Sequence, residues 1–139
     1  MSTNIRPELS KSSEYYLEKH RYYELKHFCL QYQEWKRSYA MLDGFGAGTS
    51  RFEFVPRTNI HSDPTLTIAE AKIYYSDRME MVEKAASRTD RGLSEYILKG
   101  VTEELSYDIL KAKLKIPCCK DVYYKLYRRF FWILSDLRR

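Results

Sequence analysis

The C-terminal stretch Lys115–Arg139, KIPCCKDVYYKLYRRFFWILSDLRR, places a proline in a short turn ahead of a long run that lacks proline and glycine. Proline cannot continue a helix, so we expect a turn at Leu114–Cys118 and a helix over Cys119–Leu137. Apolar side chains step by three and four along that run, which predicts one buried stripe. The stripe comprises Val122, Leu126, Phe130, Ile133 and Leu137, widened by Phe131 and Leu134.

The opposite side of this expected helix is polar and largely cationic. It presents Lys120, Asp121, Tyr124, Lys125, Arg128 and Arg129. A shorter helix is expected before the turn, over Ser106–Lys113, with Ile109 and Leu110 on its apolar side. Two helices joined by a tight turn, the second with an exposed basic side, are typical of a helix-turn-helix, whose second helix lies in the major groove of DNA.

This arrangement selects six candidate DNA-contacting residues. Near the start of the second helix, Lys120, Tyr124 and Lys125 are placed to reach bases or phosphates. One turn later, Arg128 and Arg129 are candidates for phosphate contacts or for bidentate recognition of guanine. The full set is Lys115, Lys120, Tyr124, Lys125, Arg128 and Arg129.

The basic residues gather in the C-terminal part of the chain. Between Lys111 and Arg139 there are nine lysines and arginines, opposed only by Asp121 and Asp136. The rest of the chain carries fifteen basic and seventeen acidic residues, so the excess positive charge lies in this segment. A basic end on a nearly neutral body predicts double-stranded DNA as the partner. The alternative is a basic face that is merely solvated.

Upstream, two helices are expected to form an antiparallel hairpin. The first runs from about Glu14 to Leu42 and the second from about Pro64 to Ser87, with a long, glycine-containing, mobile loop at 43–64 between them. The apolar seam of the first helix is Leu25, Phe28, Tyr32, Trp35, Tyr39 and Leu42. The facing side of the second is Ile68, Tyr75, Met79, Val82 and Ala86.

The sequence therefore predicts an all-α protein with two domains. Residues 1–90 form the helical hairpin with its mobile loop, and residues 91–139 form the helix-turn-helix, which begins with a helix at about Leu93–Val101. The long heptad-like seam also suggests a homodimer, since helix-turn-helix proteins commonly pair two half-sites of DNA.

The three cysteines indicate a reduced, cytoplasmic protein. An odd count with an adjacent pair, Cys118 and Cys119, argues against a disulfide framework and against a zinc site. Cys29 lies beside the first seam and is expected in the core. The N-terminus has no signal-peptide pattern, and no apolar run is long enough to cross a membrane.

Nothing in the sequence assembles a convincing active site, so the protein is not expected to be an enzyme or to bind a cofactor or metal. Cys29 and His27 lie on adjacent helix faces and would not meet. Glu103 and Glu104 point in different directions and are expected to be solvated. The glycines after Asp43 lack the lysine and hydroxyl residue of a phosphate-binding loop.

Two stretches resemble small phage-encoded regulators of the ArpU/RinA type. Ile116–Leu134, IPCCKDVYYKLYRRFFWIL, resembles their C-terminal end, which is similar to the helix-turn-helix of sigma-factor region four. Arg21–Lys36, RYYELKHFCLQYQEWK, resembles the opening of such proteins. The resemblance implies a transcriptional regulator of late phage genes that binds promoter DNA in the cytoplasm of a host bacterium, where RNA polymerase is a further candidate partner.

Two other functions stay open at this point. One is a protein-binding module that inhibits a host defence nuclease, in the manner of an anti-CRISPR protein, with the tyrosine-rich surface and the loop as the contact. The other is a DNA-packaging protein similar to a terminase small subunit. Binding to duplex DNA that weakens steeply with salt separates the DNA-binding functions from the inhibitor.

Overall fold

The computed structural model describes residues 14–46 and 64–139. Helices are the only regular elements in these ranges, which confirms the expected all-α class. In chain order they are α1 (Lys19–Leu30), α2 (Tyr32–Gly46), α3 (Pro64–Thr89), α4 (Ser94–Thr102), α5 (Tyr107–Ile109), the π-helical turn η2 (Leu110–Leu114) and α6 (Lys120–Leu137). No helix in the described ranges is long and apolar enough to cross a bilayer.

The long N-terminal helix predicted over about Glu14–Leu42 is wrong in two respects, because the helix begins only at Lys19 and is interrupted at Gln31. The Gln31 amide donates to the Phe28 carbonyl oxygen at 3.2 Å, a three-residue step that tightens the last turn of α1. Its side-chain amide donates to the His27 carbonyl oxygen at 3.3 Å. The apolar seam is buried on both sides of this interruption. Its buried members are Leu25, Phe28, Tyr32, Trp35 and Leu42.

The chain divides into two compact units. One comprises the residues up to Gln31 together with Met81–Arg139, and the other comprises Tyr32–Glu80, so α3 contributes to both. This division differs from the boundary that the sequence suggests after residue 90, because α1 and the last turns of α3 belong with the C-terminal helices.

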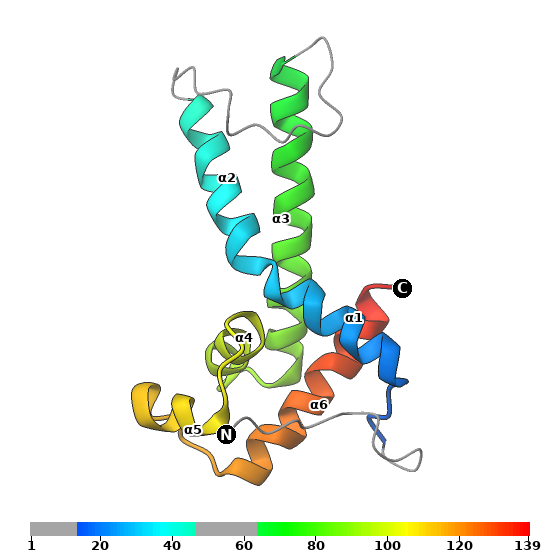
Figure 1. The fold of residues 1–139 in the computed structure, drawn as a ribbon, viewed down its shortest axis with the longest axis vertical. Coiled ribbons are helices and arrows are strands. Elements are labelled where there is room, and N and C mark those ends of the chain that lie inside the picture. Colours follow the sequence, from blue (N-terminus) through cyan, green and yellow to red (C-terminus); the bar gives the residue numbers. More distant parts are fainter. Residues whose placement is uncertain (1–13, 47–63) are drawn as a thin grey trace. The chain divides into compact units, whose positions relative to one another are not determined.

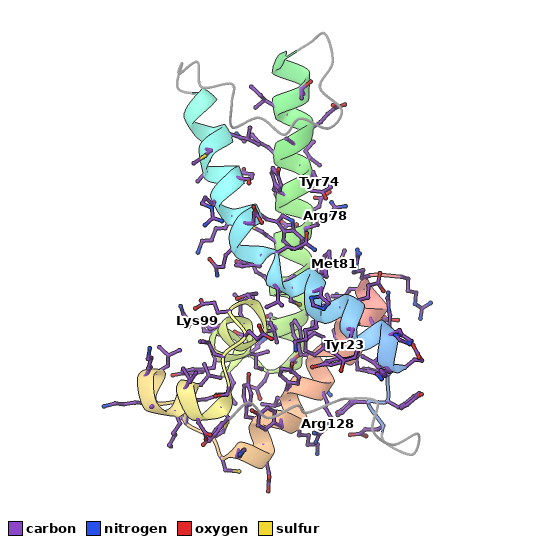
Figure 2. All side chains as sticks on the ribbon, in the orientation of Figure 1. Tyr23, Tyr74, Arg78, Met81, Lys99 and Arg128 are labelled. Atoms are coloured by element: carbon purple, nitrogen blue, oxygen red, sulfur yellow. The ribbon has the colours of Figure 1, made fainter. Side chains whose placement is uncertain are left out.

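In the unit Tyr32–Glu80, α2 and the first part of α3 run antiparallel (Figure 1), which confirms the hairpin-like pair. Lys72 joins them, since its Nζ lies 2.6 Å from Asp43 Oδ1 and 5.5 Å from the centre of the Tyr39 ring. The hydrogen bond to Asp43 is the main reason why the pKa of Lys72 is raised. On α3 the Arg78 guanidinium stacks 3.5 Å from the Tyr74 ring centre (Figure 2). The helix α2 continues to Gly46, past the point where the sequence predicts the loop to begin, and 47–63 lie outside the described residues.

In the other unit, α1, α4 and α6 contact one another, and η2 contacts α4. The first helix starts where the Glu18 carboxylate accepts the amide of His20 at 2.9 Å, a side-chain cap. The chain enters α4 through Asp90, whose carboxylate accepts the Leu93 amide at 3.0 Å. The shared core of this unit is apolar and aromatic. Its most buried side chains are Leu25, Cys29, Val82, Ala85, Ile97, Leu110, Ile116, Tyr123, Phe130, Phe131 and Leu134.

The buried side of α6 agrees only in part with the stripe that the sequence predicts, since Phe130, Phe131 and Leu134 are buried but Val122 is not. Val122 is 45% exposed, whereas its neighbour Tyr123 is 1% exposed. The buried residues of α6 are Tyr123, Tyr124, Phe130, Phe131 and Leu134. Of the other predicted members, Leu126, Ile133 and Leu137 are half-buried, whereas Tyr123 and Tyr124 are buried although they lie outside the predicted stripe. Large apolar rings line more than half of the circumference, so periodicity alone allows several orientations, and packing against α1 and α4 selects one.

Candidate nucleic-acid interface

The candidate interface is built from α5, η2, the turn Lys115–Cys119 and α6. The turn begins where Lys115 adopts the left-handed conformation, with φ 56° and ψ 47°, after the π-helical turn η2. Such a conformation is uncommon for a residue with a side chain, and it reverses the chain sharply. The next side chain, Ile116, is fully buried. The turn predicted from the proline at 117 therefore lies between two helices, and Ile116 anchors it in the core.

Two tyrosines brace the first helix against the second. The Tyr107 hydroxyl donates to the Cys118 carbonyl oxygen at 2.6 Å, which ties α5 to the turn. The Tyr107 backbone amide donates to the Tyr124 hydroxyl at 3.2 Å, which ties α5 to α6. Tyr124 is only 8% exposed and is engaged in this contact. The structure thus gives Tyr124 a positioning role inside the motif, although the sequence lists it among the residues that face DNA.

Five lysines of the motif are exposed. Three belong to the predicted set, namely Lys115, Lys120 and Lys125. Two more, Lys111 and Lys113, lie on η2 and were absent from the predicted set. Lys111 and Lys113 lie immediately before the turn and inside the basic segment, and this position could have included them in the predicted set. Only Asp108 and Asp121 oppose these five lysines between residues 107 and 125, so the motif presents a net positive surface.

The arginines of α6 are placed differently from the lysines. Arg128, labelled in Figure 2, is half-buried. Arg129 is also half-buried and donates from Nη1 to the Tyr15 hydroxyl at 3.1 Å, beside the ring pair of Tyr15 and Trp132 at 5.8 Å. This internal bond occupies part of the Arg129 guanidinium. Among the predicted arginines, Arg128 is therefore better suited than Arg129 to contact a ligand.

Arg21 of α1 caps the C-terminal end of α6. Its Nη2 donates to the backbone carbonyl oxygens of Ser135 and Arg138, at 3.0 and 2.9 Å. Its Nε donates to the Ser135 hydroxyl at 3.0 Å. The guanidinium thus satisfies carbonyl groups that a helix C-terminus leaves without partners, and it adds a favourable positive charge there. This contact holds α6 against α1 at the end remote from the lysines.

The core of this unit contains ionisable side chains that are neutral. Burial raises the pKa of the Cys29 thiol, and this effect outweighs the opposing positive charge of Arg138. Burial also raises the pKa of the Tyr123 and Tyr127 phenols above their ordinary values. Tyr127 shares a 2.9 Å hydrogen bond with the Tyr22 hydroxyl of α1. These groups pack the unit in their protonated forms, so the core that supports the interface depends on pH.

We expect the protein to lose stability in alkali from about pH 8.5 upward, where an unfolded cysteine titrates. The folded state retains the Cys29 proton at pH values at which the unfolded chain has released it. This contribution to stability is complete below the unfolded pKa and is lost as the pH rises toward the raised folded pKa. The free energy of unfolding in urea, measured with reductant present, should fall by about 1.4 kcal/mol per pH unit. Tyr123 and Tyr127 add to the fall above about pH 10.

Two single-thiol variants separate this effect from general alkaline denaturation. Cys29→Ala should remove most of the fall between about pH 8.5 and 10, because the fully buried thiol is gone and only Cys118, whose pKa burial also raises, still contributes in this range. Cys119→Ala removes an exposed thiol and should keep the fall. The same pH dependence in both variants would contradict the assignment to Cys29.

Comparison with known proteins finds no matching family model, no matching curated protein and no matching solved structure. The geometry of the chain itself therefore has to carry any functional conclusion. That geometry consists of a braced helix–turn–helix, five exposed lysines on one motif, and a second helix held at its far end by Arg21.

Proposed function

We propose that the protein binds double-stranded DNA through α5, η2 and α6, as a transcriptional regulator of the phage type. The observation that carries the proposal is the exposure of Lys111, Lys113, Lys115, Lys120 and Lys125 on a motif whose opposite side is buried. Phosphate contacts dominate the affinity of proteins for DNA, and exposed lysines at a helix–turn–helix supply them.

The backbone that carries the lysines is held in place by hydrogen bonds and buried side chains, which favours DNA binding. The bonds from Tyr107 to Cys118 and Tyr124 connect the first helix, the turn and the second helix. Ile116 and Phe130, both fully buried, hold the turn and α6 on the core. A preorganised surface loses less conformational entropy on binding than a mobile one does. In this proposal α6 enters the major groove with its first turns, and η2 lies over the phosphates.

The residue roles follow from exposure. Lys115, Lys120 and Lys125 contact DNA, with Lys111 and Lys113 adding phosphate contacts from η2. Arg128 contributes where its half-buried side chain reaches the backbone of the duplex. A homodimer on two half-sites is the finer form of this proposal, and an association with host RNA polymerase would accompany a role in transcription.

Fluorescence anisotropy with labelled duplex DNA tests the proposal. The triple variant Lys115→Ala, Lys120→Ala, Lys125→Ala should bind more weakly and should lower the slope of log affinity against log salt by about 2.7, since each phosphate contact contributes about 0.9. The measurement covers salt concentrations from about 50 to 200 mM, over which such contacts change affinity strongly.

A matched control removes the same charge elsewhere. Lys19, Lys36 and Lys84 are also exposed, and they lie on α1, α2 and α3. Their triple alanine variant should keep the wild-type slope of log affinity against log salt, because these lysines lie outside the proposed interface and do not contact phosphates. Equal slopes for the two triple variants, or no binding of duplex DNA by the wild type, would overturn the proposal. The second outcome would favour a protein partner such as a host defence nuclease.

A further inference from the structure

Val122 is an apolar side chain exposed in the middle of the cationic motif. It is 45% exposed and lies in the first turn of α6, two residues after Lys120 and three before Lys125. The same helix packs on the core through other side chains, namely Tyr123, Phe130, Phe131 and Leu134. Val122 is therefore not part of the core. An isolated exposed valine is common, but this one shares its helix face with Lys125, one turn further on.

The position of Val122 matches that of a base-reading side chain. When the second helix of such a motif enters the major groove, residues of its first turns on the outward side face the base edges. The lysines around Val122 favour a polyanion over an apolar protein surface as the occupant, by charge complementarity. Valine has no hydrogen-bonding group, so the groove feature that it can recognise is the C5-methyl group of thymine.

We infer that Val122 is a specificity-determining residue that selects thymine in the bound DNA by contact with its methyl group. The inference rests on the proposed function, since it needs α6 to lie in the major groove. Lys125 then lies beside the same base step, as a contact to guanine or to a phosphate. Asp121, also exposed in the first turn of the helix, disfavours a phosphate close to it.

The test uses duplexes that the wild-type protein selects from a randomised library. Thymines of the selected sequence are replaced one at a time by deoxyuridine, which lacks only the methyl group. At one or two positions the wild type should lose about fourfold in affinity, the value expected for one buried methyl group. Val122→Ala should bind the thymine duplex more weakly and should show a smaller loss, or none, at those same positions.

Ile109→Ala is the matched control, because Ile109 is similarly exposed, at 40%, but lies on α5. This variant should keep the full sensitivity to deoxyuridine. Because Val122 is exposed, circular dichroism should show that Val122→Ala keeps the wild-type fold.

The outcomes separate the two levels of the proposal. Salt-dependent binding without an enriched sequence, or equal deoxyuridine sensitivity in the wild type and Val122→Ala, overturns the role of Val122 and leaves DNA binding intact. Absence of any binding to duplex DNA overturns the proposed function itself and the role of Val122 with it.

Discussion

Phe131→Ala is expected to lower the free energy of unfolding by about 3–5 kcal/mol, as for other fully buried phenylalanines. The Phe131 ring is completely buried and packs edge-on against Tyr22 of α1, with ring centres 5.2 Å apart. It also contacts the Tyr127 and Phe130 rings, each with a centre-to-centre distance of 5.0 Å. Truncation would leave a cavity where α1 meets α6. Urea unfolding followed by circular dichroism measures the change.

The adjacent residue provides the control. Trp132 has the larger side chain, but it is 45% exposed and its ring contact is with Tyr15. Trp132→Ala should therefore cost about 1 kcal/mol or less, in the range of surface substitutions. If Trp132→Ala were the more damaging variant, α6 would be turned differently from the orientation described here.

Gly100→Ala is expected to destabilise the protein, by about 1–3 kcal/mol, although alanine is the better helix former. A Cβ atom at Gly100 of α4 would overlap the Tyr123 hydroxyl oxygen. The Tyr123 ring is 1% exposed and contacts Tyr107, Tyr124 and Tyr127, so it has little room to move aside. The overpacking of α4 against α6 should outweigh the gain in helix propensity, and chemical denaturation measures the difference.

The effect of Gly100→Ala on the free energy of unfolding should change sign when the Tyr123 hydroxyl is absent. With Tyr123→Phe in place, the nearest ring carbon lies 3.4 Å from the new Cβ, an ordinary contact. Gly100→Ala should then stabilise the protein by about 0.5–1 kcal/mol, the usual advantage of alanine within a helix. Tyr123→Phe alone should be nearly neutral, since the buried hydroxyl has no hydrogen-bond partner in the described part of the chain. Additive effects in this double-mutant cycle would contradict the overlap.

The helices of the C-terminal segment could be predicted closely. The predicted ranges Leu93–Val101, Ser106–Lys113 and Cys119–Leu137 each lie within one residue of α4, of α5 with η2, and of α6. The signals for these ranges are local, namely the proline at 117 and apolar periodicity. In the structure the Ser106 hydroxyl also caps α5 by accepting the Ile109 amide at 3.4 Å. The interruption at Gln31 has no comparable signal, because neither proline nor glycine lies there.

The candidate site was predicted in part. Lys115, Lys120 and Lys125 are exposed, as their place in a cationic segment suggests. Tyr124 and Arg129 were assigned to the outer side of the helix from periodicity, but their partners are Tyr107 and Tyr15. Tyr15 lies 114 positions away from Arg129, and no local pattern reports such a pair.

The amino-acid sequence alone determined the helical class, the turn at Pro117 and the concentration of positive charge near the C-terminus, because these depend on backbone propensity and composition over a few residues. Only the tertiary structure decided which side of α6 is buried. Tyrosines and phenylalanines make several sides of that helix apolar enough to pack, and the choice depends on distant residues of α1 and α4 that fill the space beside it. That choice leaves Val122 exposed among lysines and places Tyr124 inside.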